Sequence, residues 1–220
     1  MVVLKFLMFI YMNNGIVVGD RSNHKATVHL SQIFYFISFS TFFSLATFLF
    51  SFKLIKSVFL FFKNNFQIII LVLLPMICVI VKNFTLEHKF LLSDNRHFTF
   101  YIWSKIFRKY EFSRYLVSPL YLAGIYLFYR NLASNGKTLG WMVAYFVCII
   151  VGLVPQELLE FRYFIIPYFM YRLNIAKLSW KQVLFEIAFN VSINFLTIYI
   201  FLNKTFTWPD VPEEKQRFMW

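Results

Sequence analysis

Long apolar runs separated by short polar segments dominate the chain. A helix needs about 20 apolar residues to cross a bilayer, and about 17 is the practical minimum. Only some of these runs reach that length, but shorter spans are tolerated when they tilt or pack inside a larger bundle. The pattern predicts spans at 29–52, 66–81, 115–129, 139–154, 157–172 and 183–202. With the apolar segment at residues 1–12, it predicts an all-α transmembrane bundle of about seven spans.

The composition agrees with a membrane protein and indicates a single domain over residues 1–220. Hydrophobic residues make up 60% of the chain and charged residues only 15%, whereas soluble domains carry about 25% charged residues. The net charge is +12, but the basic residues lie between apolar runs and form no continuous basic patch. We therefore expect membrane lipids as partners, and no nucleic acid.

Two predicted spans carry polar residues at helical spacing. These sets are Ser40, Ser44, Thr47 and Ser51, and Glu186, Asn190, Asn194 and Thr197. A charge at the bilayer centre costs at least about 2.5–3.5 kcal/mol, so Glu186 should face protein or water. Each stripe is typical of packing contacts between helices or of the lining of a substrate cavity.

Alternating the loops across the bilayer predicts the orientation. One side holds loops 53–65, 130–138 and 173–182, which carry Lys and Arg but no acidic residue. The other side holds more Lys and Arg in total, spread through longer loops and mixed with carboxylates. Because short basic loops beside spans stay in the cytoplasm, we expect the first side to be cytoplasmic and the second luminal.

Three polar clusters interrupt the apolar pattern, and all of them fall on the expected luminal side. The first is GIVVGDRSNHKATVHL at residues 15–30, which contains Asp20, Arg21 and His24. A glycine that permits a tight turn precedes these side chains, just where a span emerges. The cluster fits either an ordinary solvated loop or part of a binding site.

The second cluster is LLSDNRHFTFYIW at residues 91–103, in which Asp94, Asn95, Arg96 and His97 are contiguous. Apolar residues then recur every four positions as far as Tyr110, with basic residues on another face. This predicts an amphipathic helix in the membrane interface. Such a helix can hold an anionic lipid headgroup through arginine, or can serve only as an anchor.

The third cluster is VPQELLEFRYFIIPYFMYRLN at residues 154–174. Pro155 is suited to open a helix, which would place Glu157 in the first turn, where a carboxylate is favoured. Glu160 and Arg162 follow, and Pro167 is expected to kink the helix. These charges can bind a substrate or can form a structural Glu160–Arg162 pair.

Signatures of metal or cofactor chemistry do not appear in the pattern. The four histidines have no metal-ligand spacing, and Cys78 and Cys148 lie far apart in apolar runs. We expect no bound metal and no cofactor.

At these three clusters the sequence resembles the dolichyl-phosphate-glucose-dependent α-1,2-glucosyltransferases, which complete the glucose cap of the N-glycan precursor. The matching stretches continue with FLNKTFTWPD and the terminal QRFMW, in the order of the family. The resemblance implies a membrane glycosyltransferase fold of the GT-C type with a luminal site in the endoplasmic-reticulum membrane. It also implies that the chain is the C-terminal portion of a longer architecture.

Enzymes of this family transfer the third glucose from dolichyl phosphate glucose to a diglucosylated, dolichyl-diphosphate-linked oligosaccharide. The configuration of the anomeric carbon is inverted in the transfer. On this basis the substrate-binding candidates are Asp20, Arg21, His24, Asp94, Asn95, Arg96, His97, Glu157, Glu160 and Arg162. The resemblance places the catalytic base in a luminal loop outside this chain, so we expect the chain to be inactive alone. The alternatives are a non-catalytic accessory protein or channel modulator and, less favoured because no internal repeat is seen, a transporter.

Overall fold

The computed structural model describes residues 2–15, 27–175 and 178–218. Within them the chain is mostly helical, as predicted. The first half contains α1 (Val2–Asn13), α2 (Ser31–Phe43), α3 (Leu45–Leu49), α4 (Phe52–Asn64), α5 (Phe66–Ile68), the π-helix η1 (Ile69–Leu73), α6 (Leu74–Phe84), α7 (Lys89–Ser93), α8 (Phe98–Ile102) and the π-helix η2 (Trp103–Phe107). The second half contains α9 (Ser113–Leu116), α10 (Ser118–Ser134), α11 (Leu139–Leu153), α12 (Arg162–Leu173), α13 (Trp180–Asn203), β1 (Thr205–Trp208) and β2 (Val211–Arg217).

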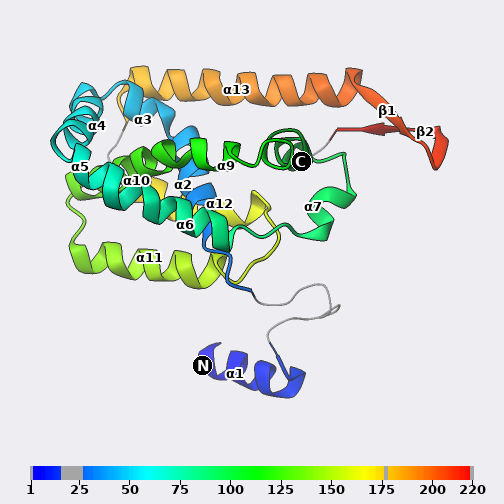
Figure 1. Ribbon diagram of the computed structural model, residues 1–220, viewed down its shortest axis with the longest axis horizontal. Helices are drawn as coiled ribbons and strands as arrows, with labels where there is room; N and C mark the ends of the chain where they lie inside the picture. The colour runs from blue at the N-terminus through cyan, green and yellow to red at the C-terminus, as the bar shows by residue number, and fades with distance from the viewer. Residues whose placement is uncertain (1, 16–26, 176–177, 219–220) are drawn as a thin grey trace.

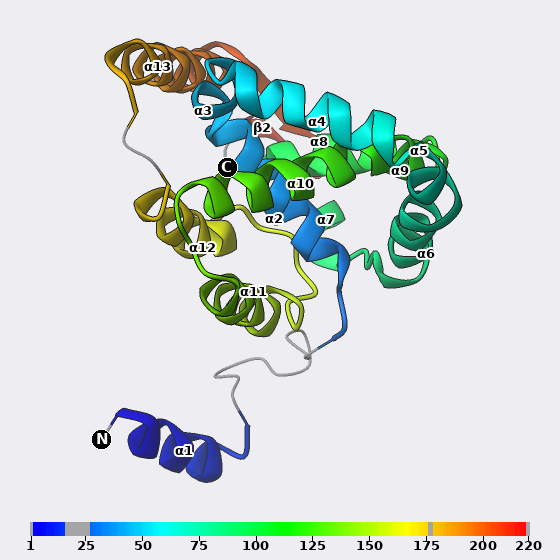
Figure 2. The same cartoon turned by 90° about the vertical axis from the view of Figure 1, so that its left-hand side faces the viewer.

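Helices α6, α11 and α13 run along the long axis of the molecule (Figure 1) and are seen nearly end-on in the turned view (Figure 2). Every apolar run assigned as a span is largely helical. Two continuous helical segments, Phe66–Phe84 and Trp180–Asn203, are long and apolar enough to cross a membrane. The described residues therefore confirm a helical protein with membrane-capable helices, while the count of seven spans stays a prediction.

Three local predictions are wrong. The all-α prediction does not hold for the C-terminal tail, where β1 and β2 pair as an antiparallel hairpin beyond α13. Residues 53–65, assigned as a loop, form most of helix α4. The run at 29–52 is not one helix, because it breaks at Ser44 between α2 and α3. Tyr168 donates its hydroxyl hydrogen to the carbonyl of Phe43 at that break, over 3.0 Å.

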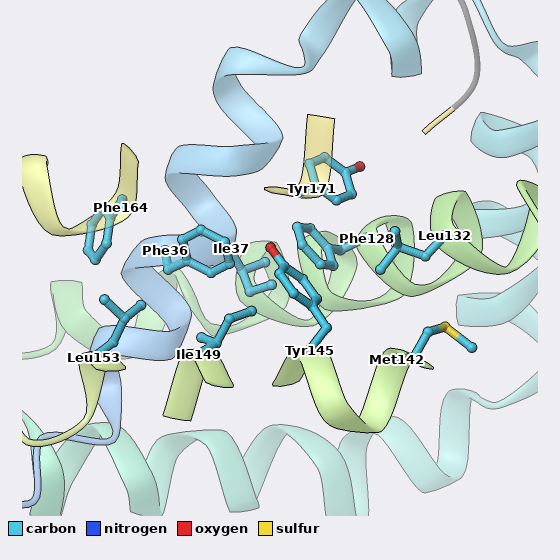
Figure 3. Close-up of a cluster of buried hydrophobic side chains, with 10 residues drawn as sticks. All are labelled: Phe36, Ile37, Phe128, Leu132, Met142, Tyr145, Ile149, Leu153, Phe164 and Tyr171. Atoms are coloured by element: carbon cyan, nitrogen blue, oxygen red, sulfur yellow. The ribbon is translucent and has the colours of Figure 1, made fainter. Parts of the chain in front are cut away.

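The main core lies where α2, α10, α11 and α12 meet (Figure 3). The ring of Phe128 is fully buried and stacks on Tyr171, with centroids 4.0 Å apart. The two aromatic hydroxyls in this core have partners: Tyr171 accepts from Asn131 Nδ2 (2.7 Å), and Tyr145 donates to the carbonyl of Pro167 (2.6 Å). Because unpaired polar groups are costly in an apolar interior, these bonds fix how the helices face one another.

Gly124 lets α10 approach α2 closely. A Cβ atom added there would lie 2.9 Å from Ile37 Cγ2 and 3.3 Å from Thr41 Oγ1. Small residues at such contacts are the usual device for close helix packing in membranes. The contact therefore depends on the missing side chain.

We predict that Gly124→Val destabilises the folded protein by about 1–3 kcal/mol, because the branched side chain overpacks the contact between α2 and α10. Gly152→Val in α11 is the matched control, since a Cβ there meets nothing within 4 Å. Thermal unfolding of the purified proteins in detergent measures both. Equal melting temperatures for the two variants would contradict the role given to Gly124.

The acidic residue of the last helix faces protein, as predicted. Both Glu186 carboxylate oxygens lie 2.8 Å from Nη2 of Arg172, and Arg172 Nη1 also donates to Thr47 Oγ1 over 3.4 Å. The two charged side chains are 21% and 17% exposed. Since α13 carries no fully buried residue, this ion pair is a principal polar link between it and the bundle.

We predict that Arg172→Gln lowers stability by about 3–5 kcal/mol, because it leaves Glu186 half-buried without its cation. The double variant Arg172→Gln with Glu186→Gln should recover much of that loss. Thermal unfolding of the two single variants and the double variant completes a double-mutant cycle. Strict additivity of the single effects would show that the pair contributes nothing.

Candidate functional site

The site is organised around a segment that is not helical. Residues 154–161, here called the strap, connect α11 to α12 in an irregular conformation. The prediction that Pro155 opens a helix and that Glu157 lies in its first turn is wrong, because α12 begins at Arg162. The strap is not helical because its carbonyl groups accept hydrogen bonds from another segment of the chain.

Five consecutive carbonyl groups of the strap accept hydrogen bonds from residues 27–32. The backbone N–H groups of Thr27 and His29 donate to residues 155 and 154, over 3.1 and 2.9 Å. His29 Nδ1 donates to the carbonyl of residue 157 over 3.0 Å. The Gln32 amide nitrogen donates to the carbonyls of residues 156 and 158, over 3.1 and 3.0 Å. Hydrogen bonds that a helix would form within itself are thus replaced by bonds to the start of α2.

The same residues also hold the loop after α6. His29 Nε2 accepts the backbone N–H of Leu86 over 3.3 Å, so the bonding pattern assigns the ring proton to Nδ1 and makes the ring neutral. Ser31 and Thr85 share a hydroxyl hydrogen bond of 2.8 Å. His29, Ser31 and Gln32 are fully buried. Loops that are far apart in sequence therefore meet at the first turn of α2.

The contiguous cluster at 94–97 forms its own clamp. Arg96 Nε lies 3.0 and 3.1 Å from the two Asp94 carboxylate oxygens, and Nη2 donates to Oδ2 over 2.7 Å. The Arg96 backbone N–H adds a bond of 2.9 Å, and His97 Nε2 lies 3.6 Å from Asp94 Oδ2. Bidentate pairs of this kind are strong and geometrically specific.

Hydrogen bonds from the Arg96 guanidinium hold the pKa of the Asp94 carboxyl below its usual value, against a weaker opposing effect of burial. Because the pKa of Asp94 is lower in the folded than in the unfolded chain, the clamp stabilises the folded state at pH values above the pKa of the unfolded chain. That contribution is lost only as the pH falls through the folded value. Asp94 is therefore an ionised acceptor at neutral pH.

The C-terminal hairpin holds this loop from the other side. Trp208 Nε1 donates to Asn95 Oδ1 over 2.7 Å. The Arg96 guanidinium carbon lies 5.2 Å from the centroid of the Trp208 ring, which is a cation–π distance. Asn95 and Arg96 are thus occupied by internal contacts, and they orient the loop.

A cavity of about 700 Å³ lies between the 91–99 segment and the end of the strap. Its lining includes four of the predicted residues, Asp94, His97, Glu160 and Arg162, together with Ser93, Thr99 and apolar side chains. Glu160 and Arg162 form an ion pair, and the Arg162 side chain is 70% exposed. The structure therefore brings the second and third sequence clusters to one cavity.

Other predicted residues lie elsewhere. Glu157 is not in the lining, and its backbone carbonyl serves as the acceptor for His29. Asp20, Arg21 and His24 lie outside the described residues. Asn95 and Arg96 adjoin the cavity without lining it.

The residues that assemble the site could not be recognised from the sequence pattern. His29 has no metal-ligand spacing, and Gln32 and Trp208 belong to no polar cluster of the sequence. Their positions carried a weak signal, because His29 and Gln32 are polar residues at the start of an apolar run. Polar side chains that become buried need hydrogen-bond partners, so polar residues inside an apolar run indicate contacts with other segments. Among the described residues, no group of three or more His, Cys, Asp or Glu side chains is placed to hold a metal ion.

The comparisons with known proteins decide the family. A model described as the DIE2/ALG10 family matches residues 1–173. This chain belongs to the DIE2/ALG10 family. No solved structure matches the chain.

Curated relatives of the family align along the chain. A rat protein named Dol-P-Glc:Glc(2)Man(9)GlcNAc(2)-PP-Dol alpha-1,2-glucosyltransferase is 43% identical over 220 residues, which is 100% of this chain and 45% of the rat protein. A human protein with the same name is 42% identical over 98% of this chain and 44% of its own length. One from Arabidopsis thaliana is 34% identical over 100% of this chain and 43% of its own length. The chain therefore spans just under half the length of these members of the family.

We predict that Trp208→Leu increases amide hydrogen exchange in the 93–98 loop, because it removes both the bond to Asn95 and the ring under Arg96. Trp208→Phe should have a smaller effect, since it keeps a ring for Arg96. Trp180→Phe is the control, as that side chain is 81% exposed. Exchange in the loop that is unchanged by Trp208→Leu would show that the hairpin does not hold it.

Proposed function

We propose that this chain is part of an inverting α-1,2-glucosyltransferase of the endoplasmic-reticulum membrane. The enzyme would transfer the third glucose from dolichyl phosphate glucose to the diglucosylated, dolichyl-diphosphate-linked oligosaccharide. The names of the rat and human relatives support this activity. The observation in the structure that carries it is the cavity in which two carboxylates, a histidine and an arginine from separate loops meet.

The groups at the cavity suit a phosphosugar. Arg162 has the guanidinium that can reach the donor phosphate, since its side chain is largely exposed at the cavity. Arginine binds phosphate through charge-assisted hydrogen bonds in a fixed planar geometry. Asp94 and Glu160 are placed to accept hydrogen bonds from sugar hydroxyls, as carboxylates do when they are ionised.

The reaction is a single displacement at the anomeric carbon. The acceptor hydroxyl oxygen forms a bond to C1 of glucose, on the face opposite the phosphate. The bond from C1 to the phosphate oxygen breaks, and dolichyl phosphate leaves with the electron pair. A carboxylate takes the hydroxyl proton, and cations stabilise the charge on the departing phosphate. We propose that this carboxylate belongs to the portion of the enzyme that the chain does not include, so that the chain alone is inactive.

We also propose the arrangement in the membrane. About seven spans of a GT-C-type fold would form a single domain over residues 1–220, with the cavity at the luminal end. The basic end of the bundle would face the cytoplasm, as short basic loops do. A long-chain lipid donor then has its chain in the bilayer and its phosphosugar at the cavity.

We predict that Arg162→Gln lowers glucose transfer roughly tenfold to a hundredfold, as expected when a charged hydrogen bond to substrate is lost. The assay uses dolichyl phosphate glucose and membranes that carry the complete enzyme. The KM for the donor should rise, because Arg162 contacts its phosphate. Lys215→Gln, which removes one exposed positive charge from the hairpin, is the control and should leave transfer unchanged. Unchanged donor KM and rate in Arg162→Gln would remove this residue from the site.

A further inference from the structure

Helix α4 at the other end of the bundle has two distinct halves. Its sequence, FKLIKSVFLFFKN, places apolar residues over one half of the helix surface. The three lysines of the helix, Lys53, Lys56 and Lys63, lie on the other half together with Ser57, Leu60 and Asn64. A helix with this division lies in the plane of a membrane interface, with its apolar half toward the acyl chains.

The position of α4 in the fold matches that division. It lies across the end of the bundle, seen end-on in Figure 1 and along its length in Figure 2, roughly perpendicular to α6, α11 and α13. Ser51 caps its start by accepting the Leu54 N–H over 3.4 Å. Part of the apolar half packs on the bundle, since Phe61 stacks on Tyr126 of α10 with centroids 4.3 Å apart.

Phe62 also packs against a core cluster, but three apolar side chains of this half are exposed. Phe52 is 77% exposed and Phe59 is 67% exposed, and Ile55 beside them is also exposed. Two large aromatic side chains that point away from the bundle on an interfacial helix are placed to enter the acyl region of the bilayer. The lysine half of α4 then lies at the depth of the lipid headgroups.

This end of the bundle carries positive charge that the described residues do not neutralise. Lys53, Lys56, Lys63 and Arg130 form no ion pair with a carboxylate among the described residues. The one carboxylate in the early turns of α13, Glu186, is already bonded to Arg172. This surface is therefore complementary in charge to an anionic ligand.

A shallow pocket of about 340 Å³ lies between the lysine half of α4 and helix α10. Its lining includes Ser57, Asn64 and Asn65, the ring of Tyr126, and Arg130 near the end of α10. An arginine with amide and hydroxyl groups beside it is suited to a phosphate ester, which it can bind through two parallel hydrogen bonds. At helical spacing the α4 residues that line the pocket lie on the face opposite Phe52 and Phe59. A phosphate in the pocket would therefore lie at the level of the headgroups while these two rings lie among the acyl chains.

We propose that the groove between α4 and α10 binds the headgroup of an anionic phospholipid, with Arg130 contacting the phosphate and the α4 lysines adding charge. The exposed Phe52 and Phe59 would lie among the acyl chains of the same leaflet. This site is at the opposite end of the bundle from the cavity with Asp94 and Glu160, and it does not depend on glucosyl transfer.

The test counts the lipids that the protein retains. The chain is reconstituted in nanodiscs of phosphatidylcholine and phosphatidylserine in equal amounts, and lipids bound to the released protein are counted by native mass spectrometry. Wild type should retain phosphatidylserine in preference to phosphatidylcholine. In the double variant Lys63→Gln with Arg130→Gln, the ratio of bound phosphatidylserine to bound phosphatidylcholine should fall roughly tenfold, because each basic residue near the surface contributes to that preference.

The matched control is Lys204→Gln with Lys215→Gln, which removes the same charge from the end that carries the hairpin, and it should keep the wild-type preference. Arg130→Lys keeps the charge but loses the planar donor pair, and it should give an intermediate result. Circular dichroism checks that each variant keeps its helix content. No preference for phosphatidylserine in wild type would overturn the proposal. Equal losses in the two double variants would also overturn it, because the preference would then follow net charge alone.

Discussion

The hydrogen bonds between residues 27–32 and the strap determine the architecture of the candidate site. A chain that leaves helical geometry inside a membrane protein exposes carbonyl groups that must find donors. Here residues 27–32, which lead into α2 and form its start, supply those donors to five consecutive residues, through two backbone N–H groups, the His29 ring and the Gln32 amide. The strap can therefore end α11, turn and begin α12 at Arg162, which places Glu160 and Arg162 at the cavity.

The two ends of the bundle differ in how many of their basic side chains are paired with carboxylates. At the cavity end, Arg96 and Arg162 each have a carboxylate partner within two residues, so charged side chains are held in place and the local charge is balanced. At the α4 end, Arg172 is paired with Glu186, but the lysines of α4 and Arg130 are not paired with any described carboxylate. A balanced, preorganised set of charges suits a sugar and its phosphate, whereas an unbalanced basic surface suits a sheet of anionic headgroups.

Apolar runs and contiguous charges could be predicted from sequence, since both depend on local order. The helices α10, α11 and α13 follow from hydropathy, and the Asp94–Arg96 clamp joins residues two positions apart. The sequence also indicated that Glu186 faces protein or water, because a charge facing lipid is costly, but its partner Arg172 could not be named. The strap could not be predicted, because Pro155 and Glu157 have the local chemistry of a helix start, and the bonds that prevent it come from residues 27–32. The hydrogen bond from Trp208 to Asn95 could not be predicted either, because it joins segments that are far apart in the sequence. Helix α4 was missed because its lysines suggested a loop, although their spacing is helical.

The most direct test of the account is the sidedness of single cysteines in sealed endoplasmic-reticulum vesicles. With Cys78 and Cys148 replaced by alanine, Asp94→Cys and Glu160→Cys would report on the cavity, and Lys56→Cys and Lys137→Cys on the basic end. Labelling with a membrane-impermeant maleimide should reach the basic-end cysteines at once and the cavity cysteines only after the vesicles are opened. If Asp94→Cys and Glu160→Cys were labelled from different sides of the membrane, the common cavity and the strap that forms it would be contradicted.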